Sequence, residues 1–247
     1  MRIAFEVVGR GRPLVLLHGF YGDRTTWHQA GHVAALADDH RLVLIDARGH
    51  GESDAPHDTD SYRIDRQVDD VIPVLDALGI DRAALWGASM GGTIGLHLAA
   101  RHPSRLTALI AGGAHAEAVA ADPDEVAQEA ALFRTQGTAP FIAWLERQGP
   151  LPPWFRTTMQ AADQHALAAL TTALATREDI TDALAETSVP LLLLASDREP
   201  RLPSIRYTAA KIPSATLVEL PNCSHLDTFL RTDLTLPAVR HFLAENR

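Results

Sequence analysis

One serine in this chain stands where a protein could turn it into a nucleophile. Ser89 lies in the segment Gly87-Ala88-Ser89-Met90-Gly91, after a short apolar run and before a helical pattern at 93–100. A G-x-S-x-G segment between a strand and a helix is typical of a sharp turn that exposes the serine hydroxyl. The glycines let strand and helix approach closely. The free N–H groups at the start of the helix favour developing negative charge. We therefore predict that Ser89 is a nucleophile.

A serine becomes nucleophilic only when a base removes its proton, and that base is typically a histidine oriented by a carboxylate. Asp197 follows the apolar run 189–195, and His225 lies in the loop after the strand-like run 215–220. Open parallel sheets build their sites at the carboxyl ends of their strands. Ser89, Asp197 and His225 are therefore the predicted catalytic triad.

Two other carboxylates lie close to these positions in the sequence. Glu199 is two residues beyond Asp197, and Asp227 is two residues beyond His225. We favour Asp197 as the acid because it alone comes directly after the apolar strand.

Backbone N–H groups near Ser89 should stabilise the negative charge of a tetrahedral intermediate. A buried strand is expected over 13–17, and the turn His18-Gly19-Phe20-Tyr21 follows it. The predicted oxyanion hole consists of the N–H groups of Phe20 and Met90, each typically contributing about 3–4 kcal/mol to the transition state. His18 is expected to brace this turn through hydrogen bonds.

Several segments in fixed order, spread over nearly the whole chain, resemble the α/β-hydrolase superfamily, and in particular its serine esterases and enol-lactonases. They are Leu17-His18-Gly19-Phe20, the run from Asp46 to Ser53, the run from Gly87 to Gly92, the run from Arg101 to Leu106, Ser196-Asp197 and Ser224-His225. The resemblance implies an α/β fold with a doubly wound, mostly parallel sheet, helices on both faces and a helical lid.

The pattern of elements agrees with that fold, because strands alternate with helices as they do in parallel sheets. Strands are expected at 2–8, 13–17, 41–46, 83–85, 106–111, 190–195 and 215–220, and helices near 25–37, 64–78, 93–100, 203–211 and 235–245. Pro73 is expected to bend or interrupt the second of these helices.

The alternation stops at 115–187, where the sequence has helical stretches and no convincing strand. We predict a core formed by 1–114 and 188–247, with 115–187 inserted in it as a lid. The helices of the lid are expected at 124–135, 140–148, 163–175 and 179–186. Substrate pockets are mostly apolar, so Tyr21, Trp144 and Trp154 are expected to contact the substrate.

The predicted activity is hydrolysis of a carboxylic ester or lactone through an acyl-enzyme intermediate. Relatives that hydrolyse epoxides or dehalogenate haloalkanes carry a carboxylate where this chain has Ser89, which disfavours both activities. Three alternatives stay open within the superfamily: a carbon–carbon bond hydrolase, a cofactor-free haloperoxidase or perhydrolase, and a ligand receptor that does not turn over.

The resemblance implies a small-molecule ester or lactone as the partner, and the composition argues against other kinds of partner. The net charge of −9 over 247 residues disfavours binding to nucleic acid. The single cysteine, Cys223, rules out an intrachain disulfide. No signal peptide and no apolar run of membrane-spanning length is found, so we expect a cytoplasmic protein with no membrane partner. Without H-E-x-x-H, paired cysteines or a phosphate-binding glycine loop, no metal and no cofactor is expected. The oligomeric state is left open.

Overall fold

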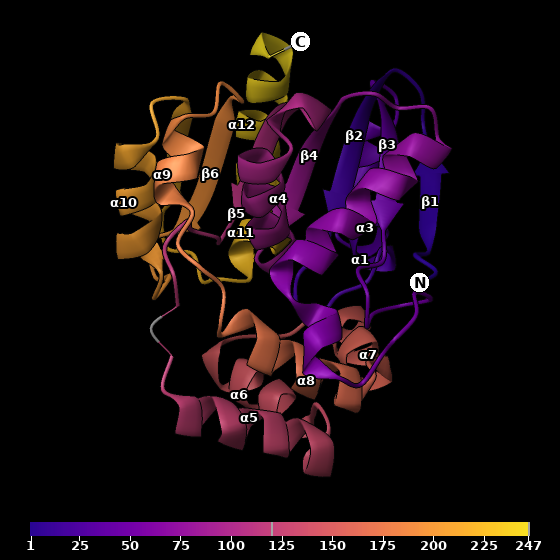
Figure 1. Ribbon diagram of the computed structural model, residues 1–247, viewed down its shortest axis with the longest axis vertical. Coiled ribbons are helices and arrows are strands. Elements are labelled where there is room, and N and C mark those ends of the chain that lie inside the picture. The colour runs from indigo at the N-terminus through magenta and orange to yellow at the C-terminus, as the bar shows by residue number, and fades with distance from the viewer. Residues whose placement is uncertain (120, 247) are drawn as a thin grey trace.

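A single sheet of seven strands forms the centre of the molecule (Figure 1). The computed structural model describes residues 1–119 and 121–246. The strands lie in the order β1-β3-β2-β4-β5-β6-β7, with β1 antiparallel to β3 and all other neighbours parallel. Their bounds are β1 Phe5–Val8, β2 Arg12–Leu17, β3 His40–Ile45, β4 Ala83–Ala88, β5 Leu106–Gly112, β6 Leu191–Ser196 and β7 Ala215–Leu220. The sheet is therefore mostly parallel, as the sequence predicted.

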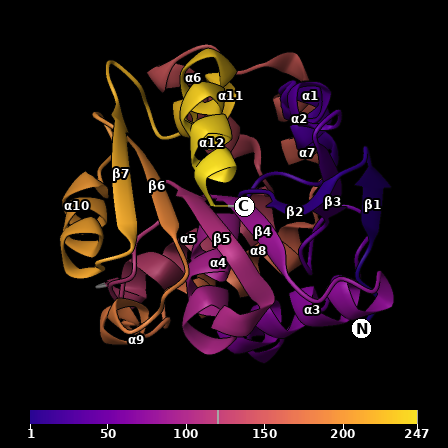
Figure 2. The ribbon, with the colours of Figure 1, turned by 90° about the horizontal axis from the view of Figure 1, so that it is seen from above.

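Helices cover both faces of the sheet, which Figure 2 shows from above. One face carries α3, α4, α9 and α10, and the other carries α1, α2, α11 and α12. The bounds are α1 Thr25–Gln29, α2 His32–Leu36, α3 Ile64–Ala77, α4 Met90–Arg101, α5 Pro123–Gln136, α6 Ala139–Gln148, α7 Pro153–Ala161, α8 Gln164–Leu174, α9 Thr181–Ala185, α10 Leu202–Lys211, α11 Asp227–Leu230 and α12 Thr232–Glu245.

Alternating side chains of the strands fill two cores, one on each face. Along β2, for example, Val15 and Leu17 face the α3–α4 side, whereas Leu14 and Leu16 face the α1–α12 side. This is the period of two that a strand imposes, with both faces apolar because both are covered. Each such side chain, when fully buried, contributes about 1.5–3 kcal/mol.

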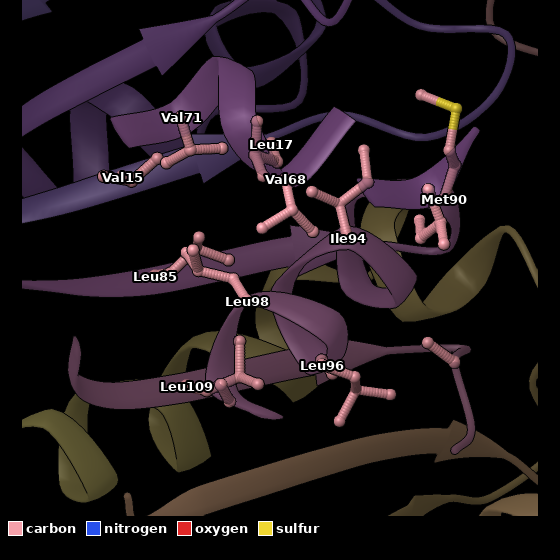
Figure 3. Close-up of a cluster of buried hydrophobic side chains, with 14 of the residues drawn as sticks. Val15, Leu17, Val68, Val71, Leu85, Met90, Ile94, Leu96, Leu98 and Leu109 are labelled. Atoms are coloured by element: carbon pink, nitrogen blue, oxygen red, sulfur yellow. The ribbon is translucent and has the colours of Figure 1, made fainter. Parts of the chain in front are cut away.

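The core on the α3–α4 side anchors the helix that follows Ser89 (Figure 3). Ile94 and Leu98 of α4 are buried together with Val68 of α3 and Leu85 of β4. Gly95 lets α4 lie close to the sheet, since a Cβ there would come 2.7 Å from Leu109 Cδ1 and 2.9 Å from Leu85 Cδ2. Tight packing of α4 against β4 and β5 leaves the turn between β4 and α4 little freedom to move.

The strand register brings three turns to the same edge of the sheet. Leu17 at the end of β2 lies opposite Gly87 of β4, and Ala88 lies opposite Gly112 at the end of β5. The segments that follow these strands, at 18–22, 89 and 113–115, are therefore neighbours in space.

The structure differs from the prediction at four places. The helix expected at 25–37 is two helices, because Gly31 between them adopts a left-handed φ of +87°. Helices α7 and α11 were not predicted. Pro153 begins α7, a position at which a proline needs no N–H partner. Pro73 does not interrupt α3, which continues through it to Ala77.

Helices α5 to α8 gather at one end of the molecule, away from the sheet in Figure 1. Within this group α5 packs against α8 and α6 against both α5 and α7, and α8 also contacts the segment Thr59–Tyr62. Helix α9 packs instead against α4 and α10 of the core. No described helix is both long enough and apolar enough to cross a bilayer.

Candidate active site

Ser89 sits at a strained turn between β4 and α4. Its φ of +50° and ψ of −106° lie where residues other than glycine are rarely found, a conformation that costs of order 1–3 kcal/mol. The turn is close-packed, because a Cβ on Gly87 would come 2.2 Å from Gly91 C and a Cβ on Gly91 would come 2.2 Å from Leu17 O. The Ser89 N–H donates to Gly112 O at 2.6 Å, which ties the turn to β5. These contacts hold the hydroxyl at the carboxyl edge of the sheet.

His225 reaches the serine from the loop after β7. Its Nε2 lies 2.9 Å from Ser89 Oγ, within hydrogen-bonding distance. The loop is held on its other side by Asp227, whose carboxylate accepts from the Ser224 N–H at 2.6 Å and from the Ser224 hydroxyl at 2.8 Å. Asp227 therefore shapes the loop next to His225, and no hydrogen bond between Asp227 and the His225 ring is found in the described chain.

The carboxylate that contacts His225 is that of Glu199, so the prediction of Asp197 needs correction. Glu199 Oε2 forms a hydrogen bond with His225 Nδ1, on the far side of the ring from Ser89. The Glu199 residue is 5% exposed. Burial alone would raise the pKa of Glu199, but the hydrogen bond with His225 brings it below its ordinary value. Glu199 thus stays ionised beside the imidazole.

Asp197 is directed to the backbone of the β7–α11 loop instead. Its carboxylate accepts from the Asn222 N–H at 2.7 Å and from the Cys223 N–H at 3.0 Å. These two hydrogen bonds keep the pKa of Asp197 below its ordinary value. Asn222 has a left-handed φ of +57°, so Asp197 stabilises the bend that leads the chain to His225.

The turn after β2 lies beside Ser89. A Cβ on Gly19 would come 3.6 Å from the Ser89 Cβ. Within the part of the chain that the structure describes, neither the Phe20 nor the Met90 N–H donates to a protein acceptor. Both amides are therefore available to a ligand oxygen, as an oxyanion hole requires.

Two buried histidines hold this turn in place. The His18 Nδ1–H donates to Gly19 O at 2.8 Å, and His18 Nε2 accepts from the Ala47 N–H at 3.1 Å. His50 Nε2 lies 2.7 Å from Phe20 O. Burial, followed by the neighbouring His50, lowers the pKa of His18 to about 4, so the ring is neutral near pH 7. The structure places His18 as a brace for the turn.

A family model described as "alpha/beta hydrolase fold" matches residues 12–178. The chain belongs to this family. The sequence and structural relatives of this chain carry names for several different activities. An enol-lactonase from Burkholderia xenovorans LB400 superposes with a TM-score of 0.83 at 27% identity, covering 98% of this chain and 96% of that one.

Two curated sequences match part of the chain. 3-oxoadipate enol-lactonase 2 of Acinetobacter baylyi (strain ATCC 33305 / BD413 / ADP1) is 30% identical over 76% of this chain and 72% of its own length. A putative 2-succinyl-6-hydroxy-2,4-cyclohexadiene-1-carboxylate synthase of Bacillus subtilis (strain 168) is 36% identical over 44% of this chain. That match covers 38% of the Bacillus protein, so this chain spans less than two thirds of that relative's length.

Aromatic side chains from the core and from α5–α7 surround the turn at Phe20. Tyr21 lies edge-on to Phe20, with 5.0 Å between ring centroids, and packs with Phe133 and Phe141. Burial raises the pKa of Tyr21. Trp154 packs in a cluster that includes Leu226, the residue after His225.

Of the three predicted substrate contacts, Trp144 has the least support from its surroundings. Its residue is 53% exposed, whereas Tyr21 and Trp154 pack in the apolar clusters beside the site. Among the described residues, no three His, Cys, Asp or Glu side chains come together as a metal site would need.

Glu199 is the site residue that sequence reasoning passed over. One signal in the sequence could have indicated it. Pro200 and Pro203 imply that helix α10 does not begin directly after β6. A carboxylate two residues past Asp197 therefore still lies at the edge of the sheet. The longer glutamate side chain then spans the remaining distance to the imidazole.

Proposed function

We propose that this protein is a serine hydrolase that cleaves a carboxylic ester or lactone through an acyl-enzyme intermediate. The observation that carries the proposal is the chain of contacts from Ser89 Oγ to His225 Nε2, and from His225 Nδ1 to Glu199. A hydroxyl, an imidazole and a buried carboxylate in this order are what nucleophilic catalysis by serine needs.

The proposed reaction follows from these positions. His225 Nε2 takes the proton of Ser89 as Oγ attacks the carbonyl carbon. The negative charge that forms on the carbonyl oxygen is stabilised by the N–H groups of Phe20 and Met90. Glu199 stabilises the imidazolium and keeps Nε2 directed at the serine. His225 then gives its proton to the leaving oxygen, which produces an acyl-Ser89.

The second half of the reaction reuses the same groups. Water replaces the leaving group, His225 takes one of its protons, and the resulting hydroxide attacks the acyl carbon. Collapse of this second intermediate returns the proton to Ser89 Oγ and releases the acid. Each half therefore begins and ends with neutral His225, and no external acid or base is consumed.

Helices α5 to α8 are proposed to act as a lid that sets which substrates enter. The support is the aromatic cluster in which Tyr21 of the core meets Phe133 and Phe141 of this segment next to the proposed oxyanion turn. Apolar walls of this kind with few polar groups are typical of small-molecule sites.

The proposal is tested with 4-nitrophenyl butyrate as substrate and a fluorophosphonate as a serine-directed label. We expect many turnovers per chain, and a single phosphonyl group per chain in the mass spectrum. Ser89→Ala should lose both, whereas Ser204→Ala, which changes a serine of α10, should keep both. Loss of the nucleophile in such a set costs on the order of 10⁶ in kcat.

Two results would overturn the proposal. One is Ser89→Ala activity within tenfold of the parent in preparations free of contaminating esterase. The other is a single burst of nitrophenol without further turnover, which would indicate a ligand receptor.

A further inference from the structure

An arginine lies closer to the reacting atoms than the proposed mechanism requires. Arg201 Nη1 is 3.4 Å from His225 Nε2, the same nitrogen that lies 2.9 Å from Ser89 Oγ. The Arg201 side chain is 50% exposed, so its guanidinium lies at the opening of the site. Its nearest carboxylate contact is Glu199 Oε1 at 4.0 Å.

This position is unfavourable for catalysis as long as the guanidinium has no other partner. His225 Nε2 must offer its lone pair to the Ser89 proton, and an N–H donor of Arg201 competes for that lone pair. A nearby cation also opposes the positive charge that develops on the imidazole. An anion bound to Arg201 would remove both effects, because it would neutralise the guanidinium and draw its donors away from Nε2.

A second, buried arginine lies near Arg201 and adds positive charge there. Arg177 is 8% exposed, and its guanidinium donates to His115 O at 3.1 Å and lies 2.9 Å from His115 Nε2. In the described part of the chain no carboxylate lies within 4.0 Å of it. Burial, and then the charge of Arg201, lower the pKa of Arg177 to about 10. Arg177 therefore remains charged at neutral pH.

His115 does not supply a compensating negative charge. Burial and the neighbouring Arg177 lower its pKa to about 4, which leaves the ring neutral. The buried carboxylate on this side is Glu199, and its hydrogen bond is already used by His225. The charges of Asp179 and Glu117 partly offset the lowered pKa of Arg177, but neither carboxylate forms an ion pair with its guanidinium in the described chain. Buried charges are normally paired, so Arg201 near the buried Arg177 is suited to an anionic ligand.

We propose that Arg201 binds a carboxylate of the substrate, so that the preferred substrates are monoesters or lactones of dicarboxylic acids. This inference rests on the proposed serine-hydrolase function. Arg201 Nη1 can be no farther from Ser89 Oγ than the two distances through His225 Nε2 added together. The carboxylate must therefore lie only a few carbon atoms from the carbonyl that Ser89 attacks. Arg201 is a specificity-determining residue in this reaction.

A pair of substrates that differ only in charge tests the inference. The 4-nitrophenyl monoester of adipic acid carries a free carboxylate, and its methyl diester has the same chain without the charge. We expect the parent to prefer the monoester by about tenfold or more in kcat/KM, since charge-assisted pairs of arginine with carboxylate are among the stronger hydrogen bonds. Arg201→Gln should remove most of that preference, mainly through KM for the monoester.

Two further variants sharpen the result. Arg201→Lys should keep part of the preference, because it retains the charge but loses the fork of donors. Arg198→Gln removes an exposed arginine three residues away and should keep the full preference. A direct measurement accompanies the kinetics: calorimetric titration of adipate should show binding to the parent and much weaker binding to Arg201→Gln.

Failure of the inference can be distinguished from failure of the proposed function. Hydrolysis of both esters without preference, or a preference that Arg201→Gln leaves intact, overturns the role of Arg201 while the hydrolase function stands. An equal loss for both esters in Arg201→Gln also overturns it, since the residue would then only position His225. If neither ester is hydrolysed, the proposed function is overturned. The titration with adipate then tests by itself whether Arg201 binds a carboxylate.

Discussion

Glu199 and His225 meet through a carboxylate–imidazole hydrogen bond that Asp197, the residue directly after β6, does not make. The two carboxylates have different tasks. Asp197 accepts backbone N–H groups of the loop that carries His225, and Glu199 contacts the ring itself. This division of tasks leads to the first prediction.

Glu199→Gln should lower kcat by about 10⁴, the size of effect seen when the acid of a triad becomes an amide and the imidazole takes the wrong tautomer. Asp197→Asn should retain most of the activity, because an amide oxygen can still accept one N–H of the loop. Rates with 4-nitrophenyl butyrate measure both effects. A severe loss in Asp197→Asn together with a mild one in Glu199→Gln would show that Asp197, and not Glu199, is the acid of the triad.

The comparison of these two residues shows what sequence alone could and could not predict. Ser89 and His225 were predicted because their signals are local: a strand, a turn with small residues and a helix for Ser89, and a loop after an apolar strand for His225. Which of two neighbouring carboxylates reaches the imidazole depends on the path of the chain after β6 and on the amides of the β7–α11 loop. Those are tertiary contacts, which the pattern of residue types along the sequence does not predict.

The same reasoning explains the helices. The mostly parallel sheet could be predicted because apolar strands alternate with amphipathic helices, which is a strong local signal. The break at Gly31 and the start of α7 at Pro153 depend on backbone conformations that glycine and proline permit but do not require. The contact of Glu199 with His225 and the helix α7 were therefore missed for the same physical reason. In both places the local sequence is compatible with more than one backbone conformation.

Gly113 should be indispensable for keeping the imidazole in place. A Cβ at this position would lie 2.6 Å from His225 Cε1 and 2.9 Å from Nδ1. Gly113→Ala should therefore displace the ring and lower kcat by about 10² or more, as misplacement of a catalytic group by about 1 Å does.

Gly79→Ala is the matched control for that change. Gly79 has a φ of +65° and Gly113 one of +64°, but a Cβ on Gly79 would meet no atom within 4 Å. Both variants should lose roughly 1 kcal/mol of stability from the left-handed backbone, and only Gly113→Ala should lose activity. Equal activity of the two variants after correction for folded fraction would argue against contact between Gly113 and the working position of His225.

Trp154 and Trp144 should differ in their effect on substrate choice. Trp154 and Leu226, the residue after His225, pack against the same apolar cluster, whereas Trp144 is 53% exposed. Trp154→Ala should change the relative kcat/KM across 4-nitrophenyl esters of increasing acyl length by roughly 1–3 kcal/mol, whereas Trp144→Ala should reproduce the parent profile. A changed profile in Trp144→Ala with an unchanged one in Trp154→Ala would place the substrate on the other side of α6.

Stability should fall as the solution becomes acidic, because buried histidines are kept neutral in the folded state. His97 of α4 is fully buried, and burial, followed by Arg101 and Arg177, lowers its pKa to about 3. The unfolded chain binds a proton at His97 near pH 6.5, so it binds more protons than the folded chain between about pH 6.5 and 3. His97 therefore contributes stability that is fully present above pH 6.5 and is lost as the pH falls through this interval.

The size of that loss can be measured by urea unfolding at a series of pH values. Each such histidine can remove up to about 1.4 kcal/mol per pH unit from the free energy of unfolding within its interval. His97→Leu replaces the imidazole with an apolar side chain that cannot be protonated, so its free energy of unfolding should fall less steeply below pH 6.5. His241→Gln, which changes a side chain 74% exposed near the C-terminus, should keep the slope of the parent. The free energies of unfolding of His97→Leu and the parent could instead fall in parallel down to pH 4. Protonation of His97 would then not oppose folding, and the protonated ring would have a hydrogen-bond partner or access to solvent in the folded state.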